Sequence, residues 1–125
     1  MIDKRTERPD LGRAVQGYYD ALDRDDIEAV LEFFSGDVLY RRPGYEPISG
    51  LAALRGYYSD DRVLAPGRHV LRSVIVEGQN VAAHGAFEGE LREGGRRSVE
   101  FAAIFVFDGN DRANEHTTYF FVPAV

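Results

Sequence analysis

The 125-residue chain contains no cysteine and no tryptophan, and it has a single lysine. Without cysteine it can form no disulfide, no thiolate metal site and no cysteine nucleophile. No apolar run approaches the roughly 20 residues that a membrane-spanning helix needs. The first twenty residues are charged throughout and lack the apolar core of a signal peptide. These absences predict a cytoplasmic protein with no membrane partner.

Positive charge is also scarce, since 15 basic residues face 21 acidic ones and the net charge is −6. A negative protein repels phosphate backbones, so we expect no nucleic-acid partner. The Gly-rich phosphate-binding pattern G-x-G-x-x-G is absent, and no serine stands in a nucleophile elbow. The three histidines show no H-x-H or H-x-x-x-H spacing. We therefore expect neither a cofactor nor a metal.

What the chain does have is 44% apolar residues, 12% aromatic residues and the length of one domain, residues 1–125. Apolar residues at helical spacing predict a helix over 10–23, with Tyr18 on its inward face. A capping box at 25–28 opens a second helix that ends at Ser35-Gly36, and a short strand follows at 37–42. Ser49 is predicted to cap a third helix over 51–58.

Four strands are predicted in the second half of the chain, over 68–77, 81–92, 97–107 and 112–122. The short segments EGQN, EGGR and DGND join them and have the composition of tight hairpin turns. Helices followed by a run of strands indicate an α+β fold, in which the helices cover one face of a curved antiparallel sheet.

Centring each turn on its middle residues predicts which side chains share a face of the sheet. Glu88 then lies opposite His69, and His84 lies opposite Ser73. The predicted inner face holds His69, Leu71, His84, Ala86, Glu88, Phe101, Ala103, Phe105, His116, Thr118 and Phe120. The predicted outer face holds Val70, Arg72, Val74, Ala83, Phe87, Leu91, Ala102, Ile104, Val106, Tyr119 and Phe121. A single β-bulge would invalidate this assignment.

The inner face combines small residues, aromatic residues and all three histidines, which is typical of a ligand site. We expect His84 and Tyr18 to be the main proton-handling pair, with His69 and Glu88 as a second acid–base pair. His69 and Glu88 could instead form a structural pair at the sheet rim, and His116 could be a core histidine. The apolar outer face predicts a homodimer through some of Val74, Phe87, Ile104, Tyr119 and Phe121.

The order of elements and six short motifs resemble a known family. The motifs are Tyr18, Asp26-Ile27-Glu28-Ala29, Asp37-Val38, Pro47-Ile48-Ser49-Gly50, Ala53-Leu54-Arg55 and Phe107-Asp108-Gly109. They resemble the SnoaL-like and ketosteroid-isomerase-like branch of the nuclear transport factor 2-like superfamily. The resemblance covers nearly the whole chain and implies a cone-shaped barrel of three N-terminal helices on a strongly curved antiparallel sheet. It also implies a pocket used for isomerisation, aldol cyclisation, dehydration, epoxide opening or plain binding.

Carried over residue by residue, the family's site is incomplete in this chain. The oxyanion tyrosine of ketosteroid isomerase falls on Tyr18, but the base falls on Arg41 and the second acid on Ala103. Phe121 stands about where the family's polyketide cyclases carry an aspartate. A steroid double-bond shift by the ketosteroid isomerase mechanism is therefore disfavoured.

Arg41 is predicted to point into the pocket mouth and to hold an anionic oxygen, while Arg42 points outward. Alternatively, Arg41 is a solvated side chain paired with Glu46 or Asp37. The predicted substrate-binding residues are Arg41, Phe101, Ala103, Phe105, His116, Thr118 and Phe120.

Two functions follow from this sequence. The first is a cofactor-independent proton-transfer enzyme of isomerase, cyclase or dehydratase type, acting on an apolar oxygenated small molecule such as a polyketide-like intermediate. The second is a non-catalytic domain that binds such a ligand or a partner protein.

Overall fold

The computed structural model describes residues 10–61, 67–90 and 94–121 of the chain. Its helices are α1 (Leu11–Asp23), α2 (Ile27–Glu32) and α3 (Leu51–Gly56), and a π-helical turn, Tyr57–Asp61, follows α3. Its strands are β1 (Phe34–Arg41), β2 (Ile48–Ser49), β3 (Arg68–Glu77), β4 (Asn80–Glu90), β5 (Arg96–Phe107) and β6 (Ala113–Phe121). Leu91, predicted to lie on the outer face, falls outside the described residues.

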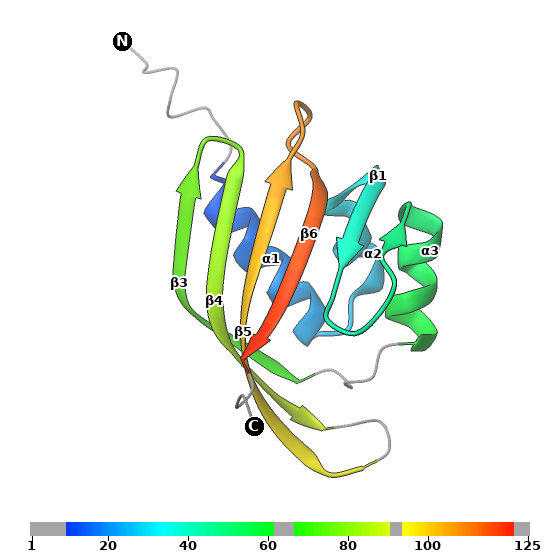
Figure 1. Ribbon diagram of the computed structural model, residues 1–125, viewed down its shortest axis with the longest axis vertical. Coiled ribbons are helices and arrows are strands. Elements are labelled where there is room, and N and C mark those ends of the chain that lie inside the picture. The colour runs from blue at the N-terminus through cyan, green and yellow to red at the C-terminus, as the bar shows by residue number, and fades with distance from the viewer. Residues whose placement is uncertain (1–9, 62–66, 91–93, 122–125) are drawn as a thin grey trace.

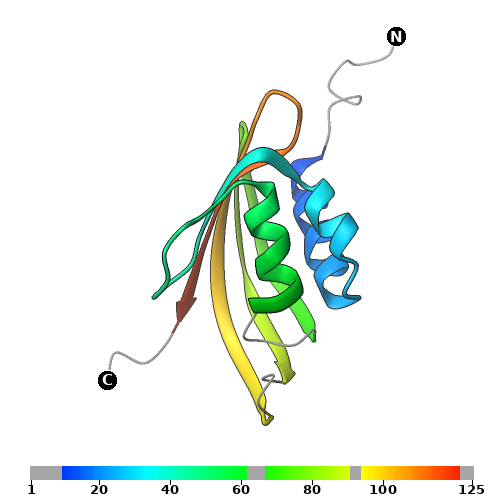
Figure 2. The ribbon, with the colours of Figure 1, turned by 90° about the vertical axis from the view of Figure 1, so that its right-hand side faces the viewer.

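The strands form one sheet in the order β2-β1-β6-β5-β4-β3, and all three helices lie on one side of it (Figures 1 and 2). The predicted α+β class, with helices packed on a curved sheet, is confirmed. The sheet is mixed and open, however, because β1 pairs parallel to β6, and β2 and β3 form two separate edges. No hairpin joins β1 to β6, so the chain did not force them to run antiparallel.

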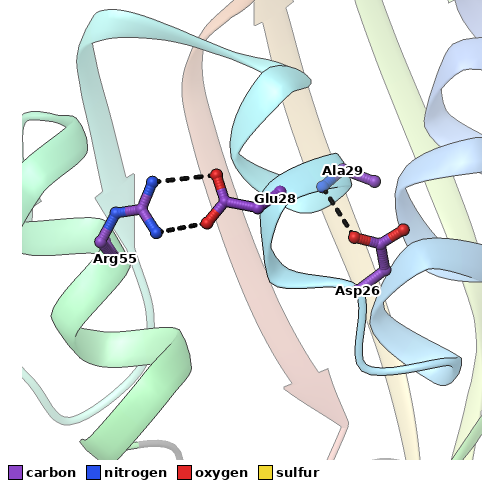
Figure 3. Close-up of polar contacts among 4 residues, drawn as sticks. All are labelled: Asp26, Glu28, Ala29 and Arg55. Carbon is purple, nitrogen blue, oxygen red and sulfur yellow. Dashed lines mark hydrogen bonds and ion pairs between the residues drawn. The ribbon is translucent and has the colours of Figure 1, made fainter.

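The first two helices each begin after an aspartate whose side chain caps them. The Asp10 side chain accepts a hydrogen bond from the Arg13 N–H at the start of α1. Asp26 accepts one from the Ala29 N–H, at 3.1 Å, at the start of α2 (Figure 3). The predicted cap of the third helix is wrong, since Ser49 lies in β2 and Gly50, with φ of 90°, precedes α3 without a side-chain hydrogen bond.

An ion pair joins α2 to α3 on the molecular surface (Figure 3). The Arg55 guanidinium donates two hydrogen bonds to the Glu28 carboxylate, at 2.5 and 3.1 Å. Both side chains are more than half exposed, at 52% and 70%. The hydrogen-bonded guanidinium lowers the pKa of Glu28, and the carboxylate raises the pKa of Arg55. A pair so open to water adds little stability, and packing holds α2 and α3 in place.

The hairpin of β3 and β4 begins in the predicted register, with Ser73 opposite His84. A bulge between Leu71 and Ser73 then moves the rest of β3 by one residue. As a result His69 lies opposite Phe87, and Glu88 lies opposite Arg68. The predicted pair of His69 and Glu88 is therefore wrong, because a bulge shifts the pairing of all residues beyond it.

The register of β4 and β5 differs from the prediction by three residues, since Glu90 pairs with Arg96. Phe101 consequently lies opposite Gly85 instead of Glu88. An odd shift moves every side chain of one strand to the other face relative to its neighbour. His84, Ala86 and Glu88 therefore lie on the outer face.

The core lies between the helices and the inner face of the sheet. The buried residues of β4 to β6 on this face are Val81, Ala83, Phe87, Phe101, Ala103, Phe105, Phe107, Ala113, His116 and Thr118. Ala83 and Phe87, which were predicted to face outward, are thus part of the core. In the β5–β6 pairing, Ala103 lies opposite Thr118 and Phe105 lies opposite His116. This register differs from the prediction by an even number of residues, so the side chains of β5 and β6 lie on the faces that were predicted for them.

None of the helices in the described ranges has the length and apolar character needed to cross a membrane.

Candidate functional site

The polar residues of the interior gather toward one end of the sheet, which we call the rim. At the rim β1 and β6 end and β3 begins, because β1 runs parallel to β6 while β3 runs opposite to it. The rim is the lower end of the sheet in Figure 1. The last residue of α1, Asp23, reaches the first residues of β3 there.

Two tyrosine hydroxyls meet beneath the helices. Tyr18 of α1 and Tyr58 of the turn after α3 are both 3% exposed, and their hydroxyl oxygens are 2.5 Å apart. The Tyr18 ring also stacks on Phe33 and meets His116 edge to face, with centroids 4.8 and 5.4 Å apart. The prediction that Tyr18 faces inward is confirmed, and its closest polar neighbour is a second tyrosine.

His116 lies in an aromatic sandwich formed by strand pairing. Its Cα partners are Tyr40 on β1 and Phe105 on β5, and both rings stack on the imidazole, with centroids 4.7 and 4.2 Å away. Nε2 lies 3.2 Å from Thr118 Oγ1, whereas Nδ1 is buried without a hydrogen-bond partner. Burial lowers the pKa of His116 to about 3. The imidazole is therefore neutral at physiological pH.

Two further tyrosines are buried beside this cluster. Burial, together with the nearby hydroxyls of Tyr58 and Tyr57, raises the pKa of Tyr40 well above its usual value. Burial likewise raises the pKa of Tyr19, whose ring lies between Tyr18 and His69 at 4.8 and 4.9 Å. Tyr19 and Tyr40 therefore stay protonated at neutral pH.

His69 has a carboxylate partner that the sequence prediction missed. Its Nδ1 donates to Asp23 Oδ1 at 2.5 Å, and its backbone N–H donates to Oδ2 at 2.8 Å. The side chain is 10% exposed, and its ring packs on Phe87 and Phe101, at 4.5 and 5.7 Å. Asp23 thus fixes both the backbone and the ring of His69 at the rim.

His84 and Glu88 lie elsewhere. The His84 side chain is 45% exposed on the outer face, and its Nε2 lies 3.6 Å from Glu100 Oε2, which also binds Arg72. Glu88 is exposed opposite Arg68. The prediction that His84 and Glu88 share a face with Tyr18 is wrong, because the β4 register is displaced by an odd number of residues.

The two arginines at the end of β1 are reversed relative to the prediction. Val38 and Tyr40 are buried, so alternation turns Arg41 outward and Arg42 inward. Arg41 is exposed. Arg42 is half-buried, and its Cζ lies 4.0 Å from the ring centre of Tyr45 and 4.4 Å from that of Tyr57.

The remaining predicted binding residues lie on the predicted inner face. Phe101, Ala103, Phe105, His116 and Thr118 are buried in the core. Phe120 shares their face but is 42% exposed, because it lies at the rim, near the end of β6. In the part of the chain that the structure describes, no three histidine, aspartate or glutamate side chains are grouped as metal ligands.

Four functional candidates escaped the sequence prediction, namely Asp23, Tyr40, Arg42 and Tyr58. Alternation along β1 could have found Tyr40 and Arg42, since Val38 already marked the inward parity. Asp23 lies five residues after Tyr18, and only the packing of α1 on β3 brings it to His69.

Comparison with known proteins agrees with the family resemblance found in the sequence. The sequence profile of the SnoaL-like domain matches residues 15–116. The chain matches none of the curated proteins with which it was compared.

Several solved structures share the fold. An NTF2-like protein of unknown function from Burkholderia pseudomallei is 19% identical with a TM-score of 0.80, over 90% of this chain and 92% of that one. A protein with a ketosteroid isomerase-like fold from Catenulispora acidiphila, solved with trimethylamine, is 15% identical with a TM-score of 0.76, over 90% and 88%. SalBIII, an epoxide hydrolase/cyclase-like enzyme of pyran ring formation in the polyether salinomycin, is 16% identical with a TM-score of 0.79, over 98% and 95%. At these identities the likeness shows the fold alone, and with the profile match it confirms the resemblance found in the sequence.

Proposed function

Because the chain belongs to the SnoaL-like domain family, we propose that it is a cofactor-independent proton-transfer enzyme. Its substrate would be a small, largely apolar molecule with a carbonyl group, and the reaction would be of isomerase, cyclase or dehydratase type. SalBIII, which shares the fold, is described as an epoxide hydrolase/cyclase-like enzyme, and this supports cyclisation as one member of the class.

One observation carries the proposal, namely the 2.5 Å contact between His69 Nδ1 and Asp23 Oδ1 at the rim. A carboxylate accepts hydrogen bonds only, so the Nδ1 atom carries the proton and Nε2 presents its lone pair. An imidazole oriented in this way is the usual arrangement of a general base. Within the described residues, His69 of the inner face has a carboxylate at its ring, whereas the ring of His116 meets Thr118 and aromatic residues.

The chemistry follows from these groups. His69 Nε2 would take a proton from the carbon next to a carbonyl, and the electron pair of that C–H bond would move onto the carbonyl oxygen. The hydroxyl pair of Tyr18 and Tyr58 would stabilise this oxyanion. Where a C=C bond is conjugated with it, the enolate could regain the proton at the far carbon of that bond. It could also attack a second carbonyl, or expel a hydroxyl group from its β-carbon as water with the proton held on His69. These outcomes are isomerisation, cyclisation and dehydration.

A deuterium-exchange assay tests the proposal without the natural substrate. 2-Tetralone, a cyclic ketone with acidic α-protons, is incubated with the protein in D₂O, and loss of the α-proton signals is followed by NMR. The wild type should accelerate exchange, and His69→Asn should lower the acceleration by about a hundredfold or more. Asparagine keeps a donor for Asp23 and removes the base.

His84→Asn is the matched variant, because it removes an imidazole from the outer face. We expect it to exchange 2-tetralone at the wild-type rate. Equal rates for His69→Asn and the wild type would overturn the proposal, as would a loss confined to His84→Asn.

A second function is favoured by how completely the interior is filled. Tyr18 and Tyr58 are 3% exposed and His116 is 1% exposed. A core this closed supports a domain that binds a ligand at the rim without chemistry. Binding of 2-tetralone with no acceleration of exchange in any variant would favour this function.

We also propose that the protein is a cytoplasmic homodimer that associates through the outer face of the sheet. Exposed apolar side chains on this face support the proposal, namely Ile75, Ile104, Tyr119 and Phe121. Two residues named in the sequence-based prediction take no part, since Phe87 is buried in the core and Val74 lies opposite Ala83 on the inner face.

A further inference from the structure

Arg42 occupies a position in which a charged side chain is unexpected. It follows Val38 and Tyr40 on the inward-facing parity of β1, and these two residues are 0% and 6% exposed. Its neighbour Arg41 points to solvent. The fold therefore directs one of two consecutive arginines toward the helix-covered side of the sheet, where it meets Tyr57.

Two aromatic rings hold the Arg42 guanidinium. Its Cζ lies 4.0 Å from the ring centre of Tyr45 and 4.4 Å from that of Tyr57, and both distances are within the range of a cation–π contact. A guanidinium in contact with two rings has little freedom to turn. Its N–H groups lie in one plane, where they can meet the two oxygens of a carboxylate side by side.

No group of the described chain neutralises this cation. Arg24, Arg55 and Arg72 each pair with a carboxylate, whereas no described carboxylate lies in an ion pair with Arg42. Arg41 is solvated, as the alternative interpretation expected, but it forms no ion pair with Glu46 or Asp37 among the described residues. The Arg42 Nε atom is buried and has no hydrogen-bond partner. A buried donor left without a partner is uncommon in a folded protein, so the guanidinium has unused donor capacity.

We propose that Arg42 is the anion-binding residue of the site and that the ligand carries a carboxylate or a comparable planar anionic oxygen group. The two terminal nitrogens would donate to the two oxygens. The protein carries a net charge of −6, which repels anions at long range, so preference for an anion must arise from a local contact such as this one.

The subsite is continuous with the interior hydroxyl pair. Tyr57 stacks against Arg42, and its ring lies 5.0 Å from that of Tyr58, whose hydroxyl meets Tyr18. The inference rests on the proposed function, because it takes the apolar carbonyl substrate from there. It adds that this substrate carries an acidic group at one end. The anion preference itself requires no proton transfer.

The test compares a planar anion with its neutral analogue. The dissociation constants of 2-naphthoate and 2-naphthamide are measured by calorimetry at fixed ionic strength for the wild type, Arg42→Gln, Arg42→Lys and Arg41→Gln. The wild type should bind naphthoate about tenfold or more tightly than naphthamide. Arg42→Gln should abolish this preference, and Arg42→Lys should retain only part of it, since lysine lacks the planar fork. Arg41→Gln should behave as the wild type.

Equal binding of the two compounds by the wild type, no binding of naphthoate, or an undiminished preference in Arg42→Gln would overturn the inference. If Arg42→Gln fails to fold, Arg42→Lys decides, because an undiminished preference there would contradict a requirement for the fork. Loss of 2-tetralone exchange chemistry with the anion preference intact would refute the proposed function alone. Exchange that depends on His69 in a protein without anion preference would refute the subsite alone.

Discussion

The environment of His116 results from the pairing of three strands. Tyr40 and Phe105 are its direct partners on β1 and β5, so their rings cover both faces of the imidazole. Nothing in the neighbouring sequence predicts this sandwich, because its members lie far apart along the chain. The stacked rings exclude water, which favours the neutral form and leaves Nδ1 without a partner.

Protonation of His116 should make the protein sensitive to acid. The pKa of His116 in the folded protein is about 3, against 6.5 for an ordinary histidine, so below about pH 6.5 only the unfolded chain binds this proton. The destabilisation caused by His116 is absent above that pH and grows as the pH falls toward 3. At about pH 4.5 it should cost roughly 2–3 kcal/mol.

His116→Phe should remove this cost and keep a flat ring between Tyr40 and Phe105. Urea unfolding at pH 7.5 and pH 4.5 measures the free energy of unfolding. Between these two conditions the variant should lose about 2–3 kcal/mol less of this free energy than the wild type. His84→Phe, which alters an exposed imidazole, should lose as much as the wild type. An identical loss in His116→Phe and the wild type would contradict the assignment.

The bulge in β3 depends on a glycine in the strand beside it. Gly85 lies opposite Leu71, where the bulge begins. A Cβ added at Gly85 would come within 2.1 Å of the Val70 carbonyl oxygen and 3.0 Å of the Leu71 Cα. Both are backbone atoms, so the clash could be relieved only by moving a strand.

Gly85→Ala should therefore destabilise the protein by about 1–3 kcal/mol, as overpacking of a core does. Gly17→Ala is the matched variant, since Gly17 is exposed in α1 and a Cβ there would meet nothing within 4 Å. It should stabilise the protein by about 0.5–1 kcal/mol through helix propensity. Denaturant titrations of both variants provide the measurement. An unchanged free energy of unfolding in Gly85→Ala would contradict the close approach of β3 and β4 at the bulge.

The elements themselves were largely predictable. The predicted strand at 68–77 has its observed bounds, and the other three β-meander strands end within two residues of the prediction. Alternating apolar residues and turn composition are local signals, which explains this agreement. The two-residue strand β2 carried no such signal, and its pairing with β1 became visible only in the structure.

At the level of the complete fold, the outer face of the sheet exposes large apolar side chains to solvent. Phe121, Ile75 and Tyr119 are 71%, 65% and 55% exposed there, while the helices cover the opposite face. Sedimentation equilibrium at micromolar concentration should give twice the chain mass of 14.0 kDa. Ile104→Glu should shift the protein toward the monomer, because it places a charge within the apolar face.

Arg13→Glu serves as the control, since Arg13 is exposed on α1 at the other side of the molecule. It should leave the mass unchanged. A wild-type mass near that of a single chain would contradict the dimer, and an unchanged dimer in Ile104→Glu would place the interface elsewhere.

Local periodicity, turn composition and short motifs were enough to predict the α+β class, the order of elements, the family and the inward position of Tyr18. Which histidine faces the helices depends instead on strand register, which is set in the tertiary structure. The bulge in β3 and the odd displacement of β4 against β5 are each small changes in backbone hydrogen bonding, yet they turn His84 outward and separate His69 from Glu88. The partner that His69 has instead, Asp23, comes from a helix packed across the sheet, and no spacing along the chain encodes that contact.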